Sequence, residues 1–183
     1  MASIHDRPPE VDEQLVYGYR VGDLIKGKGK GNRTTFGTIV ERATLFTVLA
    51  RMEKATAESA VSGFSHVLNR IEAQKQLSMA YDQGREMARH VELTENTGVK
   101  VCFADPDSLW LRGINEKNNG LLQQYLPKGE DLNVFRQEDL DTIAWRLIIQ
   151  PRKSLGFKCP AELFTLNAFD FKQHQAALFV LQP

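Results

Sequence analysis

The chain has 183 residues, enough for a single domain with a sizeable core, and its hydrophobic and charged fractions of 42% and 25% are those of a soluble globular protein. Lysine plus arginine and aspartate plus glutamate each number 23, which excludes a globally basic nucleic-acid-binding chain, so any basic surface must be local. The two cysteines make neither a disulfide framework nor a metal-ligand spacing, and no apolar run approaches the roughly 20 residues of a membrane helix, so the chain fits a reducing cytoplasm and no membrane.

Strands dominate the first third of the chain. Residues 1–16 carry two adjacent prolines and mixed charge, and we expect them to be a linker. Residues 19–26, with Val21, Leu24 and Ile25 as their apolar residues, predict an extended segment, and runs rich in Thr, Val, Ile and Phe predict two further strands over 36–42 and 45–52. Because the last two are parted only by Ala43 and Thr44, we expect the three strands to form an antiparallel meander.

Helices alternate with strands in the rest of the chain. Helical periodicity, with glycine and proline as stops, predicts helices over 56–72, 84–97, 137–149 and 160–164, and one that begins near Asn115 and ends before Pro127. In the second of these, Met87, Ala88 and Val91 are expected to face inward. Two short strands, 77–81 and 101–104, complete the pattern. It predicts an α/β domain over residues 17–164, a mixed five-stranded sheet flanked by helices, followed by an apolar tail at 165–183 that docks on the domain or contacts another copy.

Three acidic residues lie where such a sheet gathers its ligands. Asp82 ends the 77–81 strand, Asp23 lies in a strand that can neighbour it, and Glu116 is expected in the first turn of its helix. A lone carboxylate there is also explained by helix-dipole compensation. Converging carboxylates repel unless a cation binds, and their oxygens select Mg²⁺ or Mn²⁺. Two such ions about 4 Å apart support phosphodiester displacement, so the trio points to cleavage or transfer of nucleic-acid strands.

Six short motifs occur in order along the chain. They are G-D-L-I-K-G from Gly22, G-T-I-V-E-R from Gly37, Y-D-Q-G-R-E-M-A from Tyr81, F-A-D-P from Phe103, W-L-R-G-I-N-E-K-N-N-G-L-L-Q-Q-Y-L-P-K-G from Trp110 and P-R-K-S-L-G-F from Pro151. With the 33 residues that separate Asp82 from Glu116, they resemble the catalytic, integrase-core domain of bacterial insertion-sequence transposases of the IS-thirty type. The resemblance covers roughly residues 3–164.

This resemblance implies a ribonuclease-H-like fold and a D-D-E polynucleotidyl transferase. Asp23, Asp82 and Glu116 would be its catalytic and metal-binding residues, with two Mg²⁺ or Mn²⁺ ions as cofactors. The implied activity is cleavage and strand transfer at insertion-sequence ends. The implied partners are terminal inverted repeats, target DNA and further copies of the chain in the DNA complex, in the nucleoid of a bacterial cytoplasm.

Candidate DNA contacts fall into three groups: a glycine-rich loop, a turn after Pro151, and the surroundings of Glu116. The loop and turn cations either are solvated or bind phosphates, Trp110 either is a core residue or stacks on an unpaired base, and the other residues near Glu116 are strand contacts. The candidates are Lys26, Lys28, Lys30, Arg33, Arg152, Lys153, Trp110, Arg112, Asn115 and Asn119. The formal G-x-x-x-x-G-K match from Gly22 lacks both the following Ser or Thr and the helix of a nucleotide-binding P-loop.

The chain also departs from the resembled family. Tyr19-Arg20-Val21 stand where the family has His-Trp-Glu, and Asp107, Leu109 and Leu111 stand where it has His, Pro and Gln. Lys117 replaces an Asn, and Ile148-Ile149 replace polar residues. They thin the polar surroundings of the trio, which weakens metal sites. The chain begins where the family's helix-turn-helix region should end, so we expect a truncated copy, a fragment or a partner chain. Two functions stay open: an active transposase core, or a catalytically weak DNA-binding module that regulates full-length transposase.

Overall fold

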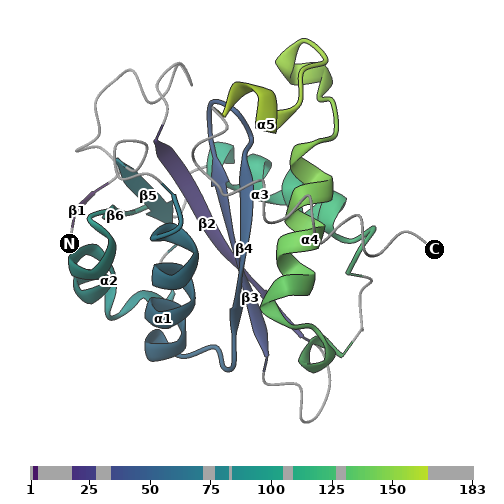
Figure 1. Cartoon of the computed structure of the whole chain (residues 1–183). Helices are drawn as coiled ribbons and strands as arrows, with labels where there is room; N and C mark the ends of the chain where they lie inside the picture. Colours follow the sequence, from purple (N-terminus) through teal and green to yellow (C-terminus); the bar gives the residue numbers. More distant parts are fainter. Residues whose placement is uncertain are drawn as a thin grey trace.

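The computed structural model describes residues 2–3, 18–27, 34–71, 77–82, 84–104, 109–126 and 131–164. A six-stranded mixed sheet with the order β1-β6-β5-β2-β3-β4 forms its centre (Figure 1). The strands are β1 (Ala2–Ser3), β2 (Tyr19–Lys26), β3 (Thr35–Glu41), β4 (Thr47–Met52), β5 (Ser78–Tyr81) and β6 (Lys100–Phe103). The β2-β3-β4 meander is antiparallel, and β5 and β6 run parallel to β2, as predicted. The short edge strand β1 was not predicted, because its two residues fall in the expected linker.

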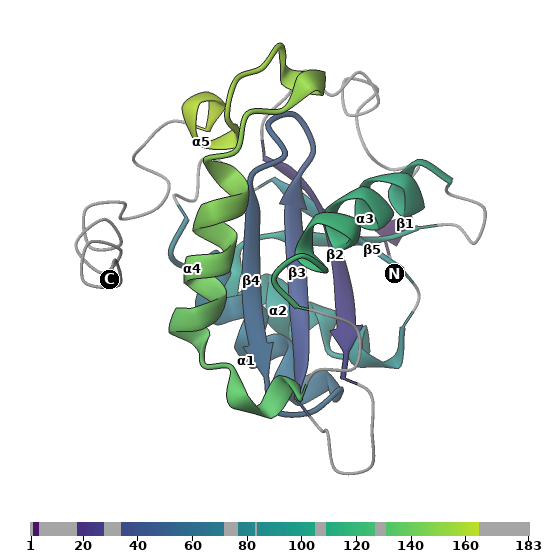
Figure 2. The ribbon, with the colours of Figure 1, turned by 90° about the vertical axis from the view of Figure 1, so that its right-hand side faces the viewer.

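Helices cover both faces of this sheet. On one face lie α1 (Ala57–Leu68) and α2 (His90–Thr97), preceded by the 3₁₀ turn η4 (Arg85–Met87), and on the other lie α3 (Leu109–Leu122) and α4 (Gln137–Ile148) (Figures 1 and 2). The short η5 (Leu132–Val134) precedes α4, while η6 (Lys153–Leu155) and α5 (Pro160–Leu163) follow it. None of the helices in these described parts is long and apolar enough to cross a membrane.

Side-chain alternation along the strands explains why both faces are covered. On β4, Val48 and Met52 belong to the apolar cluster that includes α1, whereas Leu49 belongs to the cluster with α3 and α4. The α1 helix packs directly on β3, because a Cβ atom at Gly37 would lie only 2.4 Å from the ring of Phe64. Phe64 is fully buried, so truncating it to alanine is expected to cost about 3–5 kcal/mol.

The helix that bears Glu116 starts earlier than predicted. We expected it to begin near Asn115, after a loop that carries Trp110 and Arg112, but α3 begins at Leu109. A single internal glycine, Gly113, costs only about 1 kcal/mol and does not end a helix. Glu116 therefore lies about two turns inside α3, and helix-dipole compensation does not explain it, because that effect is confined to the first turn.

The segment after Asp82 also differs from the prediction. A 3₁₀ turn, η4, precedes α2, and the tighter winding changes which side chains face inward. Met87 is buried as expected, but Ala88 is exposed and Val91 is 59% exposed, while Leu93 is fully buried instead. Gly98 ends α2 with a left-handed φ of 74°, as its glycine signal predicted.

Arg20, one of the residues that differ from the resembled family, is buried at the start of β2. Arg20 is 1% exposed, and burial lowers its pKa to about 10 although the charge of Glu41 opposes the change. Glu41 is itself fully buried and accepts hydrogen bonds from the backbone of Gly18 and from Thr44. This buried polar group joins the start of β2 to the β3–β4 turn.

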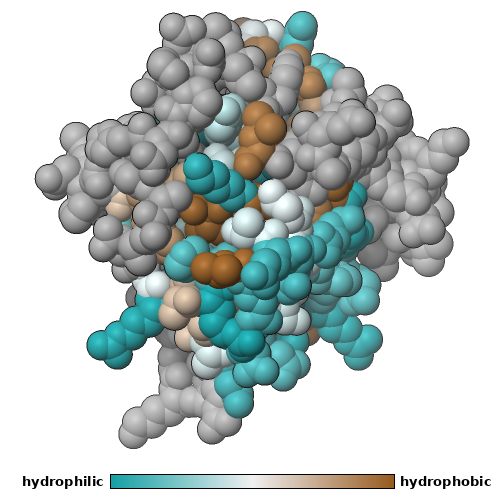
Figure 3. Space-filling model, turned by 90° about the vertical axis from the view of Figure 1, so that its left-hand side faces the viewer, coloured by the Kyte–Doolittle hydropathy of each residue, from teal (hydrophilic) through white to brown (hydrophobic). Residues whose placement is uncertain are grey.

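Large apolar side chains at the surface are scattered over the described parts of the chain. The exposed ones are Leu77, Val91, Val134, Ile149 and Phe157, which come from separate elements. On the face seen in Figure 3, hydrophobic spots are separated by hydrophilic atoms. The described residues on that face therefore form no broad apolar surface.

Candidate active site

Asp23 and Asp82 lie next to each other on adjacent parallel strands. The register of β2 and β5 pairs Gly22 with Tyr81, and the two aspartates are the next residues along each strand. Two residues earlier, Val21 and Ala80 belong to the small apolar cluster against which Ile114 of α3 packs. Because side chains alternate along a strand, Asp23 lies on the α3 face of the sheet, and its charge interacts with that of Asp82, which directly follows β5.

The carboxylate of Asp23 is half-buried and held by two hydrogen bonds. Its Oδ1 accepts from the backbone N–H of Leu24 at 2.8 Å, and its Oδ2 accepts from Nδ2 of Asn119 at 3.0 Å. Burial raises the pKa of Asp23, these two bonds lower it, and the nearby charges of Asp82 and Glu86 raise it further. A carboxylate that is desolvated beside like charges favours the binding of a proton or a cation.

Two neighbouring asparagines fix α3 against the sheet. Oδ1 of Asn118 accepts a hydrogen bond from Oγ1 of Thr47 at 3.1 Å, and Asn119 holds Asp23. Asn118 is 7% exposed, so this anchor is buried. Glu116 precedes Asn119 by three residues, which places both on one side of the helix, and its side chain is exposed.

The structure brings two of the three predicted acidic residues together. Asp23 and Asp82 interact through their charges, but within the described residues no group of three His, Cys, Asp or Glu side chains is close enough to hold a metal ion. The donors present are all oxygens, which suits Mg²⁺ or Mn²⁺ chemically. Glu116 belongs to no such group in the described residues, and its convergence with the pair stays a prediction.

Two residues of this site have contacts that the sequence did not indicate. Asn119, whose predicted contact with a DNA strand stays a prediction, donates a hydrogen bond from its amide to Asp23. Glu86, in η4, lies close enough to raise the pKa values of both Asp23 and Tyr81. The only sequence signal for Glu86 was its place four residues after Asp82 in the motif from Tyr81.

The other candidate DNA contacts have different surroundings. Lys28, Lys30 and Arg33 lie outside the described residues, as does Asp107, and Trp110 and Arg112 are in the first turn of α3. The exposed ones are Lys26, at the end of β2, and Lys153, in η6, while Asn115 is half-buried on α3. Arg152 is also half-buried: its Nη2 donates to the carbonyl of Leu147 at 2.8 Å, and burial lowers its pKa.

Curated relatives of this chain are transposases. It is 51% identical over 163 residues to the transposase for insertion sequence element IS1086 from Cupriavidus metallidurans, a match that covers 89% of this chain and 48% of the relative. It is 37% identical over 160 residues to transposase InsI for IS30A from Escherichia coli, covering 87% and 41%. For the IS4351 transposase of Bacteroides fragilis the identity is 32% over 165 residues, covering 88% and 48%. The chain therefore spans about half the length of these relatives or less, and no protein-family model matches it.

Solved structures with the same arrangement of elements are retroviral integrase cores. The catalytic core domain of BIV integrase aligns with a TM-score of 0.60 at 16% identity, over 88% of this chain and 99% of that one. The HTLV-2 integrase catalytic core domain, solved in complex with magnesium, aligns with a TM-score of 0.58 at 18% identity, over 80% and 95%. At such identities the likeness concerns the fold alone. It confirms the predicted α/β, ribonuclease-H-like fold.

Proposed function

We propose that this chain, which is homologous to IS30-type insertion-sequence transposases over most of its own length, is the DNA-cleaving core of such an enzyme. The observation that carries the proposal is the Asp23–Asp82 pair, on the helix-covered face of an integrase-like sheet, with Glu116 on the helix that crosses this face. The reaction would be metal-dependent cleavage and strand transfer of phosphodiester bonds. Terminal inverted repeats and target DNA would be the substrates, in a complex with several copies of the chain.

The residues have separate roles in this proposal. Asp23, Asp82 and Glu116 would hold Mg²⁺ or Mn²⁺, and Glu116 must approach the aspartate pair for all three to act together. When bound, the cation supplies a Lewis acid for the scissile phosphate and lowers the pKa of the attacking water. Asn119 would orient the Asp23 carboxylate and oppose the effect of burial on its pKa, because a hydrogen bond to the charged form favours that form.

A catalytically weak DNA-binding module is the second candidate. The absence of a three-ligand metal group from the described residues favours it, as does the departure of Asp107, Leu109 and Leu111 from the resembled pattern. Such a module would bind DNA, and assemble with full-length transposase, without efficient cleavage. The two candidates differ in strand cleavage, not in DNA binding.

The test is metal-dependent nicking of DNA that carries insertion-sequence ends. With Mn²⁺, the parent chain is expected to nick this DNA, and Asp82→Asn and Glu116→Gln are expected to abolish nicking. Glu95→Gln, an exposed change on α2 across the sheet, is the matched control and should nick like the parent. Mn²⁺ binding is measured in parallel. A folded parent that binds DNA but does not nick it supports the regulatory module, and nicking that survives Glu116→Gln rules out the assigned trio.

A further inference from the structure

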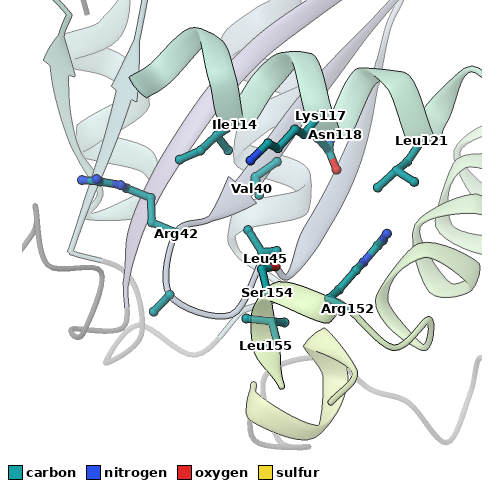
Figure 4. Close-up of a pocket in the computed structure, with 11 residues that line it drawn as sticks. Val40, Arg42, Leu45, Ile114, Lys117, Asn118, Leu121, Arg152, Ser154 and Leu155 are labelled. Atoms are coloured by element: carbon teal, nitrogen blue, oxygen red, sulfur yellow. The ribbon is translucent and has the colours of Figure 1, made fainter. Parts of the chain in front are cut away.

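A pocket of about 610 Å³ lies against one side of α3 (Figure 4). Glu116 and Asn119, on another side of the helix, do not line it. Its α3 lining includes Ile114, Lys117 and Leu121, which follow one another at helical spacing and so form one stripe. The other walls are the turn between β3 and β4 and the turn that contains η6. The volume is in the usual range for small-molecule sites, about 300–1,000 Å³.

Two sequence motifs that the carboxylate site does not use meet at this pocket. The motif of residues 37–42 ends at the β3–β4 turn, and the motif of residues 151–157 forms the η6 turn. Within the described parts of the chain, only two residues other than glycine have a positive φ: Leu45, at 59°, in the first turn, and Phe157, at 65°, in the second. Each such conformation costs about 1–3 kcal/mol and tends to mark functional sites.

The first of these turns is held rigidly. Buried Glu41 accepts hydrogen bonds from the backbone and the hydroxyl of Thr44, and its own carbonyl accepts from the N–H of Leu45 at 2.9 Å. Phe46, next along the chain, stacks on Phe164 with ring centroids 4.1 Å apart. These contacts fix Leu45 in the pocket wall, so the hollow is built into the fold.

The pocket combines an apolar wall with positive charge. Its lining includes no aspartate or glutamate, and three of its residues, Arg42, Lys117 and Arg152, carry positive charge. In Figure 4, Lys117 lies on α3 above Leu45, whereas the guanidinium of Arg42 points away from Leu45. Lys117 is exposed, so its ammonium is available to a ligand, whereas Arg152 is half-buried and already donates to the Leu147 carbonyl. The matching occupant has an anionic group joined to a flat or apolar one.

We propose that this pocket binds one unpaired nucleotide of the DNA strand, with its phosphate at Lys117 and its base against the apolar wall. This inference rests on the proposed function, because Lys117 directly follows Glu116, so the pocket and the proposed carboxylate site share the helix α3. Bases taken out of a duplex are commonly held between apolar side chains. The exposed ring of Phe157 offers the adjacent base a stacking surface.

A peptide ligand fits the pocket less well. Peptides that bind beside a sheet usually pair with an open strand edge. The edge strand next to this region is β4, and none of its residues lines the pocket. Charge complementarity with a phosphate therefore favours the nucleotide.

The test compares the binding of a blunt DNA duplex with that of the same duplex carrying a two-nucleotide overhang that includes 2-aminopurine. The parent is expected to prefer the overhang about tenfold, within the range found for base stacking on proteins, and to shield the 2-aminopurine from acrylamide quenching. Lys117→Gln should remove the preference by taking away the phosphate partner, and Ser154→Trp should remove it by filling the pocket. Lys54→Gln, an exposed lysine away from the lining, should retain it.

The same samples separate failure of the pocket from failure of the proposed function. Glu116→Gln is expected to keep the overhang preference while it loses nicking, so nicking reports on the carboxylates and the overhang preference reports on the pocket. If the parent shows no preference, or if folded Lys117→Gln keeps both preference and shielding, the pocket does not bind a nucleotide. A synthetic hexapeptide of alternating Asp and Leu is tested as a competitor of the overhang. If the parent binds this peptide and Lys117→Gln does not, the inference is overturned and the pocket is assigned to a peptide.

Discussion

Replacing Asn119 with leucine is expected to weaken divalent-cation binding and to move its pH dependence upward. The amide of Asn119 donates to Oδ2 of Asp23 at 3.0 Å and lowers the pKa of that carboxyl, against the effects of burial and of the charges on Asp82 and Glu86. Leucine is similar in size but has no donor. The pKa of Asp23 should therefore rise further, and protons should compete with the cation up to a higher pH.

The magnitude follows from the hydrogen bond. A bond to a charged group contributes about 1.5–3 kcal/mol net. Asp23 is half-buried, so solvent screens part of this energy, and the lower end of the range applies. About 1.4 kcal/mol corresponds to a tenfold change in Kd. We therefore expect the Kd for Mn²⁺ to rise up to tenfold where Asp23 titrates, and to rise less at higher pH, where the carboxylate is ionised in both proteins.

The assay is a Mn²⁺ titration followed by electron paramagnetic resonance between pH 5 and pH 8. Gln123→Leu, an exposed change one turn further along the chain, is the matched control and should bind like the parent. An identical Kd and pH profile in Asn119→Leu would refute the reasoning. Tighter binding would also refute it, because the amide would then act only by masking Oδ2.

Three further predictions concern stability, DNA binding and the start of α3. Because burial raises the pKa of Asp23, the folded chain holds that proton more tightly than the unfolded chain, and this contribution to stability falls as the pH rises above the ordinary carboxyl range. Asp23→Asn should therefore raise Tm by about 2–4 °C at pH 7 and by less at pH 4, and a lower Tm in calorimetry at pH 7 would contradict this. Replacing Lys28 and Lys30 with alanine should reduce the slope of log K against log salt for DNA binding by about 0.9 per lost phosphate contact. An unchanged slope would show that these lysines do not contact phosphates. Asp107→His, Leu109→Pro and Leu111→Gln together should speed metal-dependent cleavage, because Pro suits the first residue of α3 and the change at position 107 removes a negative charge that repels phosphate. Cleavage by the triple variant no faster than by a robust parent, with Glu116→Gln as the inactive control, would show that this segment does not limit activity.

The pairing of Asp23 with Asp82 was predictable, whereas the position of the third carboxylate was not. Short extended segments with apolar residues identified β2 and β5, and the parallel pairing of these strands brings the residues at their carboxyl ends together. The Asp23–Asn119 bond joins residues 96 positions apart and depends on the rotation of α3 about its axis. Helical periodicity indicates the buried side of a helix, but it does not specify rotation closely enough to predict a hydrogen bond.

The start of α3 shows a second limit of sequence reasoning. The helix was expected to begin near Asn115, but it runs through Gly113, whose penalty is only about 1 kcal/mol, and Ile114 packs on the sheet. The inward positions after Asp82 were wrong for a related reason, because the η4 turn changes the helical phase before α2 begins. In both cases the kind of element was predicted, and its phase was set by contacts distant in sequence.

The position of Glu116 depends on the part of α3 that precedes its two anchors. Asn118 is tied to Thr47 and Asn119 to Asp23, so the helix is fixed immediately after Glu116. Toward the N-terminus the chain leads back through Leu111 and Leu109, where it departs from the family it resembles. A small tilt of α3 about the anchors would move Glu116 relative to the aspartate pair. Under both proposals, a strand that contacts Lys117 would act on this same helix, so DNA binding and completion of the carboxylate site would be coupled through α3.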